Sequence, residues 1–142
     1  MKTYLHTQPA GRWLVIPALV AIVLTGVAVG TRAWAVLAGV AVLGVVSWIF
    51  RSLTVEVADG VFRWRFGSGW PSGTVPLGDI ASAEAVRTAW WAGWGIHVTR
   101  WGWLYNIAGF EAVAIRTKSG RRLAVGTDDP AGLVRALVGV QR

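Results

Sequence analysis

The stretch LTVEVADGVFRWRF, residues 53–66, decides the class of the folded part of this chain. In residues 53–58 every second residue is apolar, and in residues 62–66 aromatic residues alternate with arginines. An apolar residue at every second position is typical of a strand with one buried face. Asp59 and Gly60, between the two runs, tolerate a positive φ and suit a tight type I′ turn. The stretch therefore predicts an antiparallel β-hairpin.

Strand-like segments continue towards the carboxyl end. Glycines and prolines interrupt residues 67–79, so no regular element is expected there. The turn Lys118-Ser119-Gly120 separates two alternating runs and predicts a second hairpin. The expected strands after the first hairpin cover residues 80–87, 96–99, 103–107, 112–116 and 121–125.

The last segment is expected to be an amphipathic helix. Asp128 or Asp129 can cap its first turn, and Pro130 suits the first helical position. Several strands followed by one such helix, in about 90 residues, predict a small antiparallel β-barrel or sandwich, closed by a C-terminal α-helix that covers an open end. The apolar stripe of the helix comprises Leu133, Val134, Leu137 and Val138.

The residues before the first hairpin are of a different kind. Residues 13–30 and 34–50 carry no charged side chain, and Arg32 lies in the short link between them. As helices, runs of this length reach about 26 Å, close to the thickness of a bilayer core. Trp13, Trp34 and Trp48 flank them, as is typical of membrane interfaces. The sequence predicts a transmembrane helical hairpin.

Three parts of the chain follow from this division. They are a cytoplasmic N-terminal segment (1–12), the transmembrane hairpin (13–50) and a cytoplasmic domain (51–142). Basic residues flank the hairpin at both ends, whereas its link carries only Arg32. The positive-inside rule then predicts a multi-pass protein of the inner membrane with both termini in the cytoplasm. A cleaved secretory signal is the alternative, because Ala33-Trp34-Ala35 resembles a cleavage site.

Small residues in the apolar runs allow close helix packing. Gly26 and Gly30 form a G-x-x-x-G pair, and Ala35 and Gly39 form a looser one. Packing of the two helices against each other is the first interpretation, and dimerisation of two copies is the second. Neither run has an ionisable interior residue, so transport by this chain alone is not expected.

Composition restricts the chemistry. The chain of 142 residues has no cysteine, which excludes disulfides, thiol nucleophiles and cysteine-bound zinc. No P-loop, G-x-S-x-G or H-E-x-x-H motif is present, so we expect no enzyme, no metal site and no cofactor. The excess of arginine over lysine, with abundant alanine, glycine and tryptophan, indicates a GC-rich bacterial genome. Part of the formal charge of +7 lies on residues that flank the predicted membrane helices. The positive charge left for the folded domain is moderate, so nucleic-acid binding is not expected.

Two groups of residues are candidates for contact with a lipid or a protein partner. Basic residues gather around the second predicted turn, where anionic lipid headgroups can attract them. Tryptophans crowd into residues 90–103, and such clusters are enriched at interfaces. The structural alternatives are a solvated sheet edge for the first group and core packing for the second. The candidates are Arg116, Lys118, Arg121, Arg122, Trp90, Trp91, Trp94 and Trp101.

Several motifs resemble those of bacterial PH-like domains attached to a short transmembrane hairpin. They are GWGIH (93–97), WGWLYN (101–106), the Gly120-Arg121-Arg122 turn and GTDDP (126–130). The resemblance covers most of residues 53–140 and implies about seven strands with a C-terminal helix. It implies no catalytic residue.

Together these observations predict a membrane-anchored interaction or assembly module of PH-like type that is not catalytic. Its partners would be the lipid bilayer and another protein or a second copy of the chain. One alternative is a peripheral sensor of anionic lipid headgroups that uses the basic hairpin and exposed tryptophans. Another is an accessory subunit of a larger membrane complex.

Overall fold

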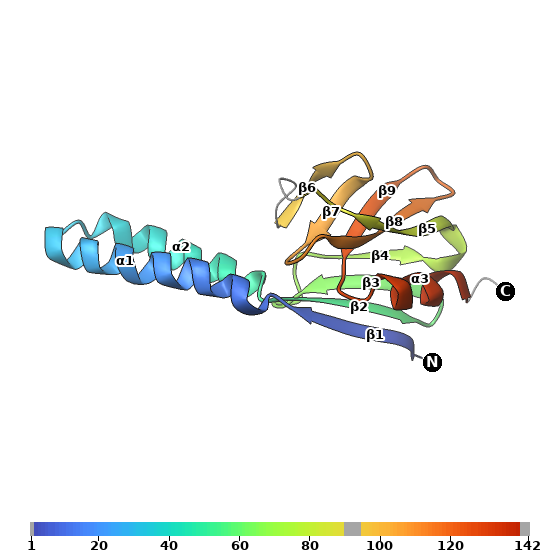
Figure 1. Cartoon of the computed structure of the whole chain (residues 1–142), viewed down its shortest axis with the longest axis horizontal. Helices are drawn as coiled ribbons and strands as arrows, with labels where there is room; N and C mark the ends of the chain where they lie inside the picture. The colour runs from blue at the N-terminus through green and yellow to red at the C-terminus, as the bar shows by residue number, and fades with distance from the viewer. Residues whose placement is uncertain (1, 90–94, 140–142) are drawn as a thin grey trace.

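The computed structural model describes residues 2–89 and 95–139 (Figure 1). In these two ranges one strand and a pair of apolar helices precede the other strands of two β-sheets and a terminal helix. Short 3-10 turns, η1 (Gly11–Leu14) and η2 (Leu77–Asp79), connect some of the elements. The helices are α1 (Val15–Thr31), α2 (Ala35–Ile49) and α3 (Pro130–Gly139). The strands are β1 (Lys2–Pro9), β2 (Ser52–Ala58), β3 (Val61–Phe66), β4 (Ser72–Pro76), β5 (Ile80–Arg87), β6 (Gly95–Thr99), β7 (Gly102–Asn106), β8 (Glu111–Thr117) and β9 (Arg122–Gly126).

The first sheet is antiparallel, in the order β1-β2-β3-β4. Its centre is the predicted hairpin, with β2 and β3 in register from Leu53↔Phe66 to Ala58↔Val61. Asp59 has a φ of 50° and Gly60 a φ of 75°, which confirms the turn with two positive φ angles.

Strand β4 corrects the expectation that residues 67–79 lack a regular element. Gly73 of this strand pairs with Trp64 of β3. A Cβ atom on Gly73 would lie only 2.2 Å from the indole ring of Trp64. The glycine is therefore there because a large ring passes over it, and it does not interrupt the strand.

Strand β1 was not predicted, and it changes how the N-terminal segment is understood. It pairs with β2 from Tyr4↔Val57 to Pro9↔Ser52, although the whole helical hairpin lies between them in the chain. The side chain of Gln8 is buried, and Thr7 and Thr54 are joined through their hydroxyl groups at 2.9 Å. Residues 2–9 thus belong to the same sheet as β2–β4.

The second sheet has the order β5-β8-β9-β7-β6. Strands β8 and β9 form the second predicted hairpin, from Ala112↔Gly126 to Arg116↔Arg122. The β6–β7 hairpin lies beside it, because β7 pairs with β9 in parallel. Gly102 makes this close approach possible: its φ is +92°, and a Cβ atom there would lie 2.1 Å from the carbonyl oxygen of Arg122.

The expected closed barrel is wrong. No strand ladder joins the two sheets within residues 2–89 and 95–139, because the turn η2 redirects the chain between β4 and β5. The sheets instead enclose one apolar core, and α3 packs against β1, β5 and β8 (Figure 1). The predicted terminal helix is thus confirmed, and it covers an open side of the two-sheet structure.

The aromatic centre of the core is Trp64, which is 1% exposed. Its ring centroid lies 5.1 Å from that of Tyr105 in the second sheet and 5.5 Å from that of Phe62. Contact between Trp64 and Tyr105 therefore connects the two sheets directly.

The two apolar helices extend away from the sheets as an antiparallel pair (Figure 1). Their apolar side chains are exposed on all sides, as in Ile22 (68%) and Val42 (63%), and Ala28 is the one fully covered residue of the pair. Residues Gly11–Thr31, 21 in number with a mean hydropathy of 2.4, are long and apolar enough to cross a membrane. Such a helix near the N-terminus fits a membrane span or a signal sequence.

Two expectations about the helices need correction. Helix α2 has 15 residues, or about 22 Å, so only one of the two helices has the length of a full span. The glycines also do not mediate packing of α1 on α2. A Cβ atom added to Gly26, Gly30 or Gly39 would have no neighbour within 4 Å. These glycines lie on the outer surface of the pair.

The start of α3 is tied to β1. The backbone N–H of Gly132 donates to Oδ1 of Asp129 at 2.9 Å, which identifies Asp129 as the cap. The hydroxyl of Tyr4 donates to Oδ2 of Asp129 at 3.0 Å, and His6 contacts the carboxylate of Asp128. The N–H of Gly132, and then the Tyr4 hydroxyl, hold the pKa of Asp129 below its ordinary value. Burial, together with Asp129, raises the pKa of Tyr4.

Acidification is expected to loosen this connection. Because the pKa of Asp129 is lowered in the folded state, its contribution to stability is complete above the ordinary value of 3.8 and disappears as the pH falls through the folded value. Asp129→Asn keeps the capping group but not the charge. We expect it to flatten the dependence of the urea midpoint on pH between about pH 5 and pH 2. Asp129→Ala should lower the midpoint at neutral pH as well. If the urea midpoint of Asp129→Asn depended on pH in the same way as that of the unsubstituted protein, this assignment would be contradicted.

Candidate functional site

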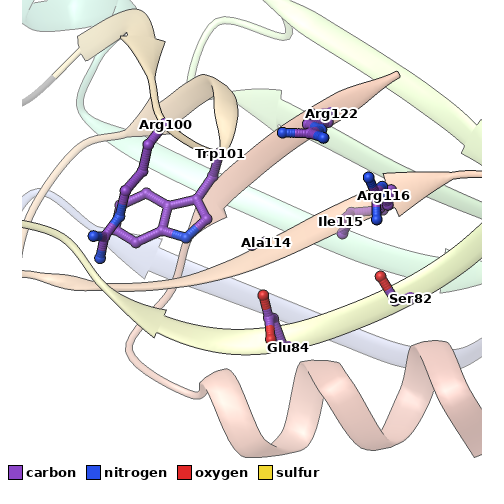
Figure 2. Close-up of a pocket in the computed structure, with 8 residues that line it drawn as sticks. All are labelled: Ser82, Glu84, Arg100, Trp101, Ala114, Ile115, Arg116 and Arg122. Atoms are coloured by element: carbon purple, nitrogen blue, oxygen red, sulfur yellow. The ribbon is translucent and has the colours of Figure 1, made fainter. Parts of the chain in front are cut away.

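A depression of about 200 Å³ lies on the face of the second sheet that is turned away from the core (Figure 2). Strands β5, β8 and β9 contribute to it, together with the turn between β6 and β7. A larger hollow of about 800 Å³, formed by residues 87–89 and 97–101, shares Arg100 and Trp101 with it. The lining residues of the depression are Ser82, Glu84, Arg100, Trp101, Ala114, Ile115, Arg116 and Arg122.

Strand alternation explains its shape. Along β8, Val113 and Ile115 point into the core, so Ala114 and Arg116 belong to the outer face. Ala114 pairs with Glu84 of β5 on one side and with Ala124 of β9 on the other. The small alanine side chains leave the middle of this face low, between longer side chains around it (Figure 2).

Trp101 forms one wall of the depression. Its ring packs against a small apolar cluster on the outer face, which contains Leu104, Ala112 and Ala124. The backbone N–H of Trp101 donates to Oγ1 of Thr99 at 3.2 Å, which stabilises the turn. The guanidinium of Arg100 lies 4.2 Å from the centroid of the Trp101 ring, within the range of a cation–π contact.

The charge of the depression is positive. Its three arginines and the single carboxylate of Glu84 give a formal charge of +2. Arg116 and Arg122 are directly opposite each other on β8 and β9. Within the part of the chain that the structure describes, no carboxylate lies within ion-pair distance of either. Like charges at opposed positions destabilise a sheet, so this pair is unfavourable for folding alone.

The predicted contact residues separate into three groups. Arg116, Arg122 and Trp101 come together in the depression. Lys118 and Arg121 do not. The Nζ atom of Lys118 donates to the carbonyl of Gly78 at 2.6 Å, and Arg121 lies exposed on the β8–β9 turn. The other predicted contact residues, Trp90, Trp91 and Trp94, lie outside the described residues.

The basic turn lies at the end of the domain remote from the apolar helices. At the near end, the N–H of Gly67 donates to the carbonyl of Ile49 at the end of α2. At the other end of β2 and β3, the N–H of Leu77 donates to Gly60. The N–H of Lys118 donates to Asp79 beside it, so the β8–β9 turn is also at this far end. With about 3.3 Å per strand residue, the seven residues of β2 separate the two ends by about 23 Å.

The sequence did not predict that Arg100 and Glu84 would join the site. Arg100 reaches it only because β7 lies next to β9, and this parallel pairing has no local signal. Glu84 is placed by the pairing of β5 with β8. The opposition of Arg116 and Arg122 does follow from the sequence, because the turn between them sets the register of the hairpin.

The structure places the remaining polar residues apart. No group of three histidine, aspartate or glutamate side chains that could bind a metal occurs in residues 2–89 and 95–139. Glu56, Asp79 and Glu111 lie on β2, η2 and β8, respectively. His97 of β6 lies opposite Leu104 of β7 in the antiparallel pair that these two strands form.

Comparison of the chain with protein-family models, with curated proteins and with solved structures found no match.

Proposed function

We propose that this protein is a bacterial inner-membrane protein with two spans, whose helical hairpin anchors a cytoplasmic, non-catalytic interaction module of PH-like type. The observation that carries the proposal is the pair of apolar helices that project from the sheets with their side chains uncovered. Burial of apolar surface is favourable by about 25 cal/mol per Å². A bilayer supplies that burial over the full circumference of the pair.

The pairing of β1 with β2 supports two spans. Strand β1 precedes the helices and β2 follows them, yet the two are hydrogen-bonded neighbours in one sheet. This pairing favours a hairpin whose two ends lie on the same side of the membrane, as an anchor with two crossings would have. Removal of α1 as a signal sequence would also remove β1 from the sheet. The short α2 can span with its flanking tryptophan and arginine at the interface.

The residues at the ends of the hairpin support its orientation. Arg12 lies 5.7 Å from the ring centroid of Trp13, and Arg51 lies 5.6 Å from that of Trp48. Both pairs are at the end next to the sheets, where indole rings and cations suit the headgroup region. The opposite end carries Arg32 alone. The excess of positive charge on the side of the sheets favours a cytoplasmic domain.

The PH-like part of the proposal rests on the motifs in the sequence. The two sheets followed by α3 are compatible with it, and the structure describes nine strands where the resemblance implies about seven. An interaction or assembly role fits a domain whose polar residues are dispersed and whose most concentrated charge lies on a sheet face. A role as an accessory subunit of a larger membrane complex is one form of this proposal.

The alternative of a sensor for the anchoring bilayer is less well supported. The basic β8–β9 turn is about 23 Å from the helix end of the domain, estimated from the length of β2. Electrostatic attraction is screened over about 8–10 Å at physiological ionic strength. Lys118 and Arg121 are therefore too far from that surface to be attracted to it.

Cysteine accessibility tests the proposal directly, because the natural chain has no cysteine. Ala33→Cys lies in the link between the helices, and Ala131→Cys lies on the exposed side of α3. With a membrane-impermeant maleimide, we expect Ala33→Cys to be labelled in spheroplasts and Ala131→Cys only after lysis. The unsubstituted chain is the control. Labelling of both variants from the same side would show that α2 does not cross the membrane and would contradict an anchor with two spans.

Mild-detergent purification tests the interaction role separately. We expect a partner protein or an oligomer to be recovered with the full chain. Recovery of the monomeric chain alone would count against an assembly module, whatever the outcome of the labelling experiment.

A further inference from the structure

We propose that the depression on the outer face of the second sheet binds a phosphate group carried by a small soluble molecule, with Arg116 and Arg122 as its principal contacts. This inference concerns a site in the folded domain and does not depend on the orientation of the helices.

The arginine pair itself favours a bound anion. Arg116 and Arg122 occupy opposed positions on adjacent strands, and both are exposed. No carboxylate of the described residues pairs with them. The repulsion between them lowers stability when the site is empty, and a bound anion between the two guanidinium groups removes it. A local arrangement that opposes folding is typical of a functional site.

The surface around the arginine pair has a shape that suits a small anion. Ala114 forms a low floor, and Trp101 borders it on the side opposite Arg116 (Figure 2). The depression of about 200 Å³ can admit a small anion and part of the group that carries it. In Figure 2 the indole edge that carries the nitrogen faces the depression, and this N–H is a further donor.

The charge of the lining residues and the placement of the two guanidinium groups favour phosphate over a carboxylate. Arg116, Arg122 and Glu84 give a formal charge of +1 where the phosphate would bind, and the guanidinium of Arg100 adds positive charge at the Trp101 ring, so a phosphate dianion meets charge of the opposite sign. One guanidinium satisfies both oxygens of a planar carboxylate through two parallel bonds. A tetrahedral phosphate presents oxygens in several directions and can accept from two arginines on neighbouring strands. Glu84, at the opposite rim, limits the total negative charge that the site accepts.

The position of the site favours a soluble ligand over a lipid of the anchoring membrane. Arg116 and Arg122 lie at the β8–β9 turn, at the end of the domain remote from the apolar helices. A phosphate dissolved in the surrounding solution reaches this face freely.

The test uses the full chain in mild detergent, with inorganic phosphate as the probe and chloride at the same ionic strength as the control. We expect phosphate to raise the unfolding temperature of the unsubstituted protein in a saturable way. Arg116→Gln and Arg122→Gln should weaken phosphate binding about 10-fold or more, because each removes a charge-assisted contact. Arg122→Lys retains the charge but not the planar fork, and it should bind phosphate with intermediate affinity.

Arg121→Gln is the matched control. It removes the same charge from the same turn but does not line the depression, so its response to phosphate should equal that of the unsubstituted protein. In chloride at low ionic strength, Arg122→Gln should be at least as stable as the unsubstituted protein, because one of two opposed charges is gone.

Three outcomes would overturn the proposal. The first is no response of the unsubstituted protein to phosphate beyond that to chloride. The second is a response to phosphate that Arg121→Gln and Arg122→Gln change to the same extent relative to the unsubstituted protein. The effect would then come from the net charge of the protein and not from the depression. The third is binding to phosphatidylglycerol vesicles that depends on Arg116 and Arg122 while inorganic phosphate has no effect. That result would assign the site to a lipid headgroup.

Discussion

Replacing Trp64 by alanine is expected to lower the free energy of unfolding of the two-sheet domain by about 3–5 kcal/mol. The side chain is 1% exposed, lies against Gly73 in its own sheet and contacts Tyr105 in the other. Removal of the ring leaves a cavity where the two sheets meet. The stability of single domains is typically about 5–15 kcal/mol, so this variant should lose much of its resistance to urea. Urea unfolding of the full chain in mild detergent, followed by circular dichroism, measures the effect.

Two further variants test whether the loss of stability comes from the burial of Trp64 and not simply from the removal of a tryptophan. Trp103→Ala removes the same side chain from a position that is 51% exposed, and we expect a loss several-fold smaller than for Trp64→Ala. Trp64→Phe should also cost less than Trp64→Ala. Nε1 of Trp64 is buried without a hydrogen-bond partner among the described residues, so phenylalanine loses volume but no hydrogen bond. Equal losses for Trp64→Ala and Trp103→Ala would show that Trp64 is not the centre of the core.

Gly102→Ala is expected to destabilise the domain by about 2–5 kcal/mol and to weaken the response to phosphate. A φ of +92° disfavours any side chain, at a cost of about 1–2 kcal/mol. The added methyl group would also lie 2.1 Å from the carbonyl oxygen of Arg122, and relief of such overlap costs about 1–3 kcal/mol. Strand β7 must then move away from β9, and Trp101 moves with it. Urea unfolding and the phosphate-dependent shift in unfolding temperature measure the two effects.

Gly120→Ala is the matched control for Gly102→Ala. Its φ is +90°, but a Cβ atom there would have no neighbour within 4 Å. It should therefore show the conformational cost of about 1–2 kcal/mol without the steric one. If the two variants were equally stable, the close approach of β7 to β9 would not be a feature of the folded protein.

The local elements could be predicted because their signals are local. The alternation in residues 53–66, with Asp59-Gly60 between the runs, predicted the β2–β3 hairpin, and Asp128 or Asp129 followed by Pro130 predicted the start of α3. Strand β4 was missed because its glycine and its proline are usual in turns. Only its pairing with β3 shows that Gly73 makes room for Trp64. Strand β1 was missed because it has no partner nearby in the chain.

The candidate site was predicted in part for the same reason. Arg116 and Arg122 are brought together by a single turn, so the sequence alone places them side by side. Arg100 and Glu84 come from strands that join this hairpin only in the folded sheet. Lys118 was assigned to the same surface from its position in the chain, whereas its ammonium group is bonded to the carbonyl of Gly78.

Local signals were enough to predict the apolar helical pair, most of the strands, their turns and the terminal helix, because periodicity, φ preferences and capping act between residues a few positions apart. The tertiary structure alone decided that β1 closes onto β2 across the helical pair, that the sheets remain separate, and that β7 lies parallel to β9. These arrangements depend on which apolar faces pack together over long separations in the chain. The arginine-lined depression exists only as a result of that packing.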